Sequence, residues 1–276
     1  IVVSREEGSG TRGAFEDMVM GDDALITGDA QLFPSNGAVR TSVSTTPDSI
    51  GYVSFGYLDE SVKALAIDGV EATVANASSG EYPIVRPLNM MTNGEPEGLA
   101  KAFLDFIKSD AGQEIVSEEG YLPVSGGMAD DDDSGEALSG SLTAAGSTTV
   151  QPLAEKMAGA FTADNPDVQI NVQGGGSGVG VKSAGEGTAD IGMASRAIKD
   201  EEMETFPDIV VHTIARDGIA IVVHPDVGVE GLTTDQARQI FAGEITNWSE
   251  VGGEDKPIIV VSREEGSGTR GAFEDM

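Results

Sequence analysis

The chain has 276 residues, of which 39% are hydrophobic, and its 16 Lys and Arg face 47 Asp and Glu, which gives a formal net charge of -31. This length can bury one large core or two modest ones, and such a negative charge argues against nucleic acid or an anionic membrane as a partner. No apolar run approaches the roughly 18 residues that would span a bilayer. Because cysteine is missing from the sequence, it offers no disulfide, no thiolate metal site and no cysteine nucleophile.

The chain begins with IVVSREEGSGTRGAFEDM, and the same eighteen letters return as residues 259–276. The segment is typical of a strand, a small glycine turn and the start of a helix. Its glycines fit G-x-G-x-x-G, but SREE separates them from the strand, where a dinucleotide-binding turn would follow directly. The exact repeat indicates either a circular permutant with overlapping ends or one window of a tandem array of domains.

The middle of the chain has the pattern of a domain's end followed by the beginning of the same domain. The apolar run Ile50–Phe55 predicts a strand. Residues 97–124 place Leu99, Phe103, Phe106 and Ile107 on one helical face, which predicts a closing helix. Residues 125–140 follow, with four consecutive aspartates and no hydrophobic periodicity, so they are typical of a linker. An end and a beginning in mid-chain favour permutation of a single pair of domains.

After the linker, strands and helices alternate. The stretch GSLTAAGSTTVQPLAEKMAGAF predicts a strand, a tight turn and a helix. Further strands are predicted at Val168–Val172, Ile219–Val223 and Ile258–Val261, with a helix in TTDQARQIFAGE. The alternation predicts an α/β fold with largely parallel sheets.

Three segments share one local design, a strand followed by a hydroxyl-bearing turn that opens a helix. They are residues 143–155, residues 173–187 and residues 3–17, the last with its copy at 261–275. Helix N-termini present unpaired N–H groups and a positive dipole end, to which Ser and Thr add O–H donors. Each turn alone could be an ordinary helix cap. Three such turns near an arginine favour an anion site.

Arg5, or its copy Arg263, follows the first strand directly, and its guanidinium could bind two oxygens of a tetrahedral anion. Glu7, with its copy Glu265, could orient this arginine or accept a proton from the anion; the alternative is an exposed turn residue. These residues complete a candidate oxyanion site.

The sequence gives little support for catalytic or metal-binding chemistry. The two histidines, His212 and His224, lie in no catalytic or metal motif and are expected to be structural, and no G-x-S-x-G elbow or nucleotide P-loop occurs. Trp248 is expected to be a packing residue. We therefore expect that the protein is not an enzyme and that it binds neither a metal nor a cofactor. A phosphate-ester hydrolase is retained only as an alternative.

Seven stretches together resemble the extracytoplasmic phosphate-binding protein of ABC phosphate importers, a type II periplasmic binding protein: AGSTTVQPLAE, GGGSGVGVK, ADIGMASR, IFAGEITNWSEVGG, SREEGSGTR, TPDSIGYVS and GYLPV. The resemblance implies a two-lobed α/β fold with mixed, mostly parallel sheets and a hinge. By similarity, one lobe would comprise residues 140–217 with 82–124, the other residues 218–276 with 1–81, and residues 125–139 would link them. The chain is then a rotated version of the family pattern.

The resemblance also implies the phosphate ligands. The three loops would contribute Ser147, Thr148, Thr149, Ser177, Gly178, Arg5, Ser9, Gly10 and Thr11, or Arg263, Ser267, Gly268 and Thr269 of the second copy. Where some relatives have an aspartate that accepts the proton of hydrogen phosphate, this chain has Ser195 followed by Arg196. Ser195 or Glu7 would have to accept that proton instead, and another tetrahedral oxyanion such as sulfate remains an alternative ligand.

The implied function is non-catalytic capture of inorganic phosphate for a membrane permease. The implied location is extracytoplasmic, with a lipid anchor in relatives, although no signal or anchor is visible in this sequence. Because one domain has room for one copy of the repeated segment, the other copy could dock in a neighbouring molecule. Self-association and an assembly role are therefore also expected possibilities.

Overall fold

The fold is that of a computed structural model of the chain, which describes residues 2–21, 24–124 and 138–258. The second copy of the repeated segment and nearly all of the predicted linker lie outside these residues. The first copy, in contrast, is described from Val2 through its helix.

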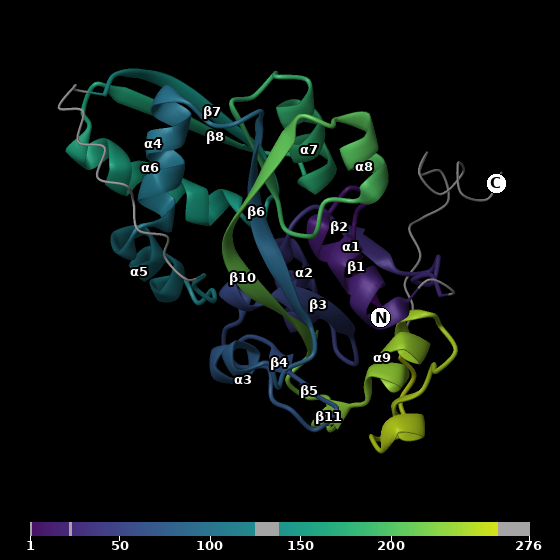
Figure 1. Cartoon of the computed structure of the whole chain (residues 1–276). Coiled ribbons are helices and arrows are strands. Elements are labelled where there is room, and N and C mark those ends of the chain that lie inside the picture. The colour runs from purple at the N-terminus through teal and green to yellow at the C-terminus, as the bar shows by residue number, and fades with distance from the viewer. Residues whose placement is uncertain (1, 22–23, 125–137, 259–276) are drawn as a thin grey trace.

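Strands and helices alternate as expected, and the predicted α/β class is confirmed (Figure 1). The helices are α1 Gly10–Phe15, α2 Asn36–Thr45, α3 Val74–Ser79, α4 Gly98–Lys108, α5 Asp110–Glu118, α6 Gln151–Asp164, α7 Ser177–Gly185, α8 Asp200–Thr205 and α9 Thr234–Phe241. The strands are β1 Val3–Arg5, β2 Gln31–Phe33, β3 Ile50–Ser54, β4 Lys63–Ala64, β5 Ala66–Ile67, β6 Val85–Asn93, β7 Gly140–Gly146, β8 Val168–Gly174, β9 Ile191–Ala194, β10 Ile209–Val223 and β11 Gly231–Leu232.

The largest sheet has the strand order β3-β10-β6-β9-β7-β8, with β4 also paired to β10. Strand β7 runs parallel to β8 and β9, whereas β10 is antiparallel to β3, β4 and β6, and β6 is antiparallel to β9. Two small parallel pairs, β1-β2 and β11-β5, complete the sheets of the described residues. The sheets are therefore mixed, as expected, but the antiparallel share is larger than the sequence suggested, because β6 and β10 run against all their neighbours.

Strand β10 is the longest and connects two parts of the molecule. Its residues Ile209–Gly218 pair with β6, and its residues Ile219–Val223 pair with β3. In Figure 1 it runs beside β6 through the middle of the molecule, between the part that contains α4 to α8 and the part that contains β3 and α9. The sequence predicted only the second, wholly apolar half, because polar residues such as His212 and Asp217 interrupt the first half.

Two large apolar cores are buried on the two sides of these strands. One gathers side chains from β1, α1, β3, α9 and the end of β10, and the other gathers side chains from α4, α5, α6, β7 and β9. Each large apolar side chain that is fully buried contributes about 1.5–3 kcal/mol of favourable transfer free energy. A smaller cluster, which includes Val181 and Ile209, lies between α7 and β10.

The predicted closing helix packs as expected but is interrupted. Leu99, Phe103, Phe106 and Ile107 all contact the second core, so the predicted face is confirmed. The prediction of a single helix was wrong, because the chain forms two helices, α4 and α5, with Ser109 between them. The Ser109 hydroxyl accepts the Gly112 N–H at 3.3 Å, which caps the start of α5.

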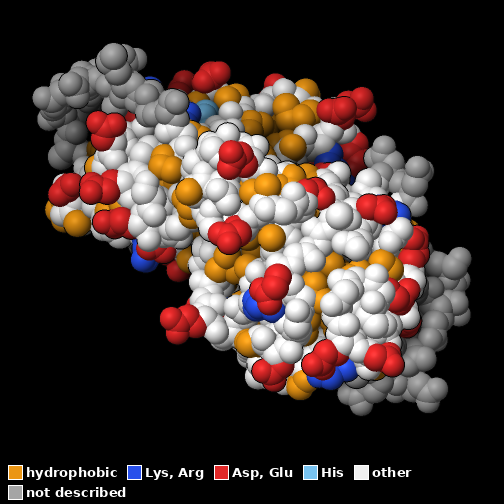
Figure 2. All heavy atoms as spheres, turned by 90° about the horizontal axis from the view of Figure 1, so that it is seen from below, with side chains coloured by type: hydrophobic (Ala, Val, Ile, Leu, Met, Phe, Trp, Pro, Cys, Tyr) orange, Lys and Arg blue, Asp and Glu red, His pale blue; other side chains and the backbone are white. Residues whose placement is uncertain are grey.

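The surface is strongly acidic. In Figure 2, Asp and Glu side chains are spread over the face seen from below, with few Lys or Arg among them. Within the described ranges, no helix has the length and apolar character of a membrane span.

Candidate anion site

The three predicted turns meet at one place. The Gly178 N–H donates to Gly8 O at 3.3 Å, which joins the α7 turn to the α1 turn, and the Gly176 N–H donates to Gly146 O at 2.9 Å, which joins it to the β7 turn. Thr11 of α1 contacts Thr149 before α6, with 3.0 Å between their hydroxyl oxygens. The structure thus assembles a cluster of hydroxyl and amide groups from segments far apart in the sequence.

Arg5 lies in this cluster at the end of β1, with only 2% of its surface exposed. Its Nε donates to Phe33 O at 3.0 Å, and its Nη2 donates to Pro34 O at 2.8 Å and to Thr148 Oγ1 at 3.0 Å. Its Nη1 is buried and has no hydrogen-bond partner among the described residues. A buried N–H group without an acceptor costs about 1–3 kcal/mol, so an acceptor bound at this atom would remove that cost.

Burial is the main reason that the pKa of the Arg5 guanidinium falls to about 10, and the nearby Arg86 contributes a smaller part of this lowering. Arg5 still carries its charge at neutral pH, because its pKa lies well above 7. This desolvated cation is well suited to bind an anion, since electrostatic attraction is strongest where water is excluded.

Three serines form a second part of the cluster. The Ser147 hydroxyl donates to Ser195 Oγ at 2.9 Å, and the Ser177 and Ser195 hydroxyl oxygens lie 3.5 Å apart. The Ser195 N–H donates to Ser177 Oγ at 3.0 Å. All three side chains are buried. Gly10 lies directly against them, because a Cβ there would come within 2.1 Å of Ser177 Oγ and 2.6 Å of Ser195 Oγ.

Residues that the sequence analysis did not predict hold this cluster together. Asn36 Nδ2 donates to Thr149 Oγ1 at 2.9 Å, the Tyr57 hydroxyl donates to Thr148 O at 3.2 Å, and the Tyr121 hydroxyl donates to Thr149 O at 3.3 Å. Asn36 sits in the first turn of α2, after Ser35, whose hydroxyl caps that helix. Nothing in its local sequence distinguishes Asn36 from an ordinary helix-start residue.

One buried ion pair and one partly buried ion pair flank the cluster. Arg86 of β6 contacts Asp217 of β10 at 2.7 Å, and its Nη1 donates to Ser195 O at 3.0 Å. Arg196 contacts both carboxylate oxygens of Glu202 at 2.7 Å. The sequence contains a signal for the first pair. Charged residues interrupt the apolar runs IVRPLNMM and TIARDGIAIVV, and a charge buried in this way needs a partner.

Most predicted residues outside the second copy lie in or beside the cluster, and three of them have roles that differ from those predicted. Ser9 caps α1, where its hydroxyl accepts the Arg12 N–H at 3.3 Å, and the Gly178 N–H is bonded to Gly8 O. Glu7 does not reach Arg5: its side chain is exposed, and the acceptors of Arg5 are backbone and hydroxyl oxygens instead. The predicted residues of the second copy, Arg263, Glu265, Ser267, Gly268 and Thr269, lie outside the described residues.

The histidines lie elsewhere. His212 is bonded to Thr92 Oγ1 at 3.0 Å and lies 3.4 Å from Lys108 Nζ, and burial lowers its pKa. His224 lies near Asp226. Over the ranges that the structure describes, no three His, Asp or Glu residues are arranged to bind a metal ion. Within the described part of the chain, the cluster therefore combines hydroxyl and amide groups with a cation, and no histidine or free carboxylate is hydrogen-bonded to one of its hydroxyl groups.

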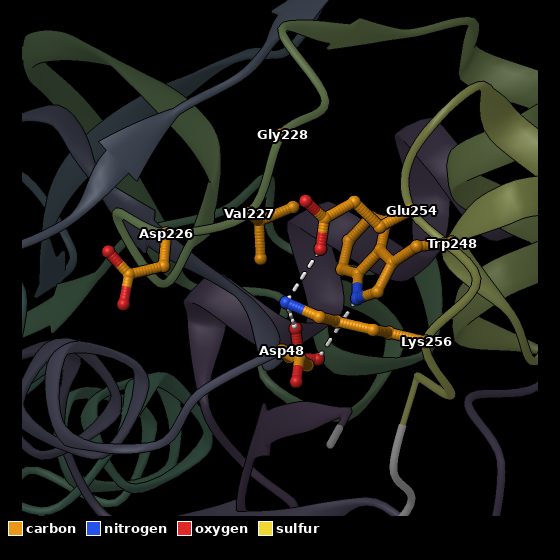
Figure 3. Close-up of a pocket in the computed structure, with 7 residues that line it drawn as sticks. All are labelled: Asp48, Asp226, Val227, Gly228, Trp248, Glu254 and Lys256. Carbon is orange, nitrogen blue, oxygen red and sulfur yellow. Dashed lines mark hydrogen bonds and ion pairs between the residues drawn. The ribbon is translucent and has the colours of Figure 1, made fainter.

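A small surface hollow lies apart from this cluster (Figure 3). Lys256 crosses it and contacts Glu254 at 2.7 Å and Asp48 at 3.9 Å, and the Trp248 Nε1–H donates to Asp48 O at 3.2 Å. Trp248 is buried, as expected for a packing residue. The ammonium group of Lys256 is already paired with the carboxylates of Glu254 and Asp48, so we assign no ligand to this hollow.

Comparison with known proteins shows the family to which the chain belongs. The PBP superfamily domain matches residues 1–111 and 132–276. The chain is 40% identical over 259 residues to phosphate-binding protein PstS 2 of Streptococcus agalactiae, covering 91% of this chain and 87% of that protein, and 36% identical over 257 residues to its namesake in Streptococcus pneumoniae. The crystal structure of a phosphate-binding protein of a phosphate ABC transporter from S. pneumoniae superposes with a TM-score of 0.70 at 36% identity, covering 91% of this chain and 98% of that one. The chain therefore belongs to the PBP superfamily and, within it, to the family of the phosphate-binding proteins PstS.

Proposed function

We propose that this protein binds inorganic phosphate and delivers it to the membrane permease of an ABC importer, without catalysing a reaction. The observation that carries this proposal is the buried Arg5 Nη1, which has no acceptor among the described residues, while Nη2 of the same side chain contacts the hydroxyl group of Thr148. A tetrahedral anion supplies the missing acceptor. The names of the relatives, which are phosphate-binding proteins, give the same ligand class.

Binding exchanges hydrogen bonds within the cluster for hydrogen bonds to the anion. Thr11 and Thr149 contact each other, and Gly10 lies tightly against Ser177, so the α1 turn moves away from these partners to admit the ligand. The hydroxyl and amide donors then contact phosphate oxygens. Micromolar affinity corresponds to roughly -8 kcal/mol, which several charge-assisted hydrogen bonds can supply once the costs of ordering are subtracted.

Two lobes around a hinge would provide this movement. We assign residues 140–217 with 82–124 to one lobe and residues 218–276 with 1–81 to the other. The two separate apolar cores support this division, since each draws its side chains almost wholly from one of the two sets. Strands β6 and β10, which run between the cores, would form the hinge (Figure 1).

Isothermal titration calorimetry tests the ligand assignment. We expect saturable heat on adding phosphate, with one site per chain and a dissociation constant in the micromolar range or below. Nitrate, a planar monoanion, serves as the control and should give no saturable heat. Saturation with sulfate and none with phosphate would refute the phosphate assignment while leaving an oxyanion site in place.

We also place the protein outside the cytoplasm and infer that the chain is a circular permutant of the family pattern. The identical segments 1–18 and 259–276 support permutation, as does the first copy, which supplies β1 and α1 to the site. The family membership supports the location and the permease partner.

The repeated segment provides a route to self-association. The first copy supplies β1 and α1, so the second copy joins two molecules only where it displaces the first copy of its neighbour from that place, and repeated exchange of this kind gives a head-to-tail chain. We expect light scattering at increasing protein concentration to show species larger than a monomer, and removal of residues 259–276 to restore monomers. A chain that stays monomeric at millimolar concentration would contradict this exchange.

A further inference from the structure

We infer that the buried ion pair of Arg86 and Asp217 sets the relative position of the two sides of the anion site, so that phosphate affinity depends on this pair. The inference rests on the proposed phosphate binding. Arg86 holds the segment that follows β9, and Asp217 holds the end of β3. Both are positioning residues, because they act on the site through other groups and belong to none of its three turns.

The Arg86 guanidinium group connects the pair to one side of the site. Its Nε and Nη2 donate to Asp217 Oδ2 at 3.0 and 2.7 Å, and its Nη1 donates to Ser195 O at 3.0 Å. Because the guanidinium group is planar and rigid, the Asp217 carboxylate determines where the Ser195 carbonyl group can lie. The Ser195 N–H donates to Ser177 Oγ at 3.0 Å, so Arg86 positions the serines of the cluster.

Asp217 Oδ1 connects the pair to the other side of the site. It accepts the Ser54 hydroxyl at 3.0 Å and the Phe55 N–H at 3.3 Å. The Ser54 N–H donates to Asn36 Oδ1 at 3.4 Å, and Asn36 Nδ2 donates to Thr149 Oγ1 at 2.9 Å. An N–H group at one end of the amide requires the oxygen there, which leaves the NH2 group for Thr149. Asp217 therefore determines, through Ser54, how Asn36 approaches the cluster.

These hydrogen bonds form a closed ring, because Ser147 joins its two ends. The Ser147 oxygen accepts the Thr149 N–H at 3.2 Å, and its hydroxyl donates to Ser195 Oγ at 2.9 Å. Every residue of the ring is buried, with at most 2% of its surface exposed. Residues within one such network are typically coupled by roughly two- to hundredfold in an equilibrium constant. A change at Arg86 or Asp217 is thus expected to affect ligand binding.

The pair lies at the boundary of the proposed lobes. Arg86 and Asp217 are partners in the register of β6 and β10, and β10 pairs with β3 from Ile219 onward. Ser195 belongs to one proposed lobe and Ser54 to the other. The pair therefore holds a segment of each lobe at the strands about which the lobes would move. Without the pair, the ligand has to order the two sides of the site, and this ordering reduces affinity.

A role in stability alone makes a different prediction. Buried ion pairs can often be replaced by apolar side chains of similar volume with little loss of stability. If the pair only stabilises the fold, such a replacement restores phosphate binding together with folding. If the pair positions the site, folding is restored and binding is not.

Arg86→Met with Asp217→Leu tests the inference by calorimetry with phosphate. This double variant removes one charge of each sign, so the net charge of -31 is unchanged. We expect it to fold, as judged by urea unfolding, and to bind phosphate about tenfold more weakly than the unmodified protein does. A phosphate affinity within about twofold of that of the unmodified protein would overturn the inference.

Ile107→Ala is the control for a general loss of stability. Ile107 is fully buried in the second core, and the cavity left by its truncation lowers stability. Since Ile107 takes no part in the ring, phosphate affinity should stay within about twofold. If this variant loses as much phosphate affinity as the double variant, reduced stability alone explains the weaker binding and the inference is wrong.

Ser54→Ala decides the question if the double variant does not fold, and Ser49→Ala is its matched control. Both serines are fully buried, one at each end of β3, but the Ser49 hydroxyl donates to the carbonyl groups of Val43 and Thr46. Removing the Ser54 hydroxyl breaks one bond of the ring, so we expect about threefold weaker phosphate binding. Ser49→Ala should bind phosphate as the unmodified protein does. Equal affinities of the two variants would overturn the inference.

Phosphate binding by the unmodified chain separates this inference from the proposed function. If the unmodified chain binds no phosphate, the proposed function fails and the inference fails with it. If the chain binds phosphate and the double variant binds it equally well, only the positioning role of Arg86 and Asp217 fails.

Discussion

Arg5→Met is expected to lower phosphate affinity by more than about 100-fold. Truncating one partner of a buried, hydrogen-bonded charge pair typically costs 2–5 kcal/mol, and about 2.7 kcal/mol corresponds to 100-fold. Methionine keeps much of the apolar stem of Arg5, so the packing at the end of β1 changes little. Calorimetry measures the loss directly.

The stability of the ligand-free protein should respond differently from its affinity. Arg5 is a desolvated cation with an unpartnered Nη1, so its removal relieves a cost of about 1–3 kcal/mol while losing the bonds of Nε and Nη2. We expect the free energy of unfolding in urea to fall by no more than about 1 kcal/mol. Arg238→Ala is the control: this arginine is paired with Asp235 on the surface at 2.9 Å, and its loss should leave affinity within about twofold.

The repeated segment makes the same substitution informative in the second copy. Arg263→Met should leave phosphate binding unchanged, because the first copy supplies the arginine of the cluster. Binding that survives Arg5→Met and disappears only in the double variant would show that the second copy can take the same place. Binding that survives the double variant would refute the role of this arginine.

The second large effect is expected at the buried ion pair between Arg86 of β6 and Asp217 of β10. Asp217→Asn should lower the free energy of unfolding by about 3–5 kcal/mol, because it leaves the Arg86 charge buried without its counter-ion. Asp217 and Arg86 are paired across the two strands and are both almost completely inaccessible to solvent. Urea unfolding followed by circular dichroism gives the magnitude.

A double replacement separates the cost of an isolated charge from the value of the pair. Arg86→Met with Asp217→Leu removes both charges together, and we expect it to recover most of the loss, to within about 1–2 kcal/mol of the unmodified protein. Asp235→Asn, which breaks an exposed pair, should cost less than about 1 kcal/mol. If Asp217→Asn lowers the free energy of unfolding by no more than this surface variant does, the buried ion pair makes no specific contribution to stability.

Short local patterns were sufficient to predict the three turns and the arginine of the site. A strand followed by Gly, Ser and Thr and then by a helix is encoded within about fifteen residues, and β1-α1, β7-α6 and β8-α7 have this form. That the turns meet depends on how the strands pair, which no single segment specifies. The family resemblance supplied this information.

The sequence could not indicate which residues support the cluster or that the Glu7 side chain does not reach Arg5. Asn36, Tyr57 and Tyr121 reach the cluster from elements distant in the chain, and their roles depend on tertiary contacts alone. Proximity in sequence suggested that Glu7 would orient Arg5. The carbonyl groups of Phe33 and Pro34 orient it instead, because β2 pairs with β1 and brings them alongside.

Strand β10 also limits how the molecule can change shape. Its first half contributes Ile214 and Ala215 to one core, and its second half contributes Ile219 to Val223 to the other. A rotation of one half of the molecule against the other must therefore twist this strand and β6, while the side-chain bonds around Arg5 can break one at a time. We therefore propose that the cluster around Arg5 is the side of the structure that opens first, and that the paired strands β6 and β10 form the stiff axis of this motion.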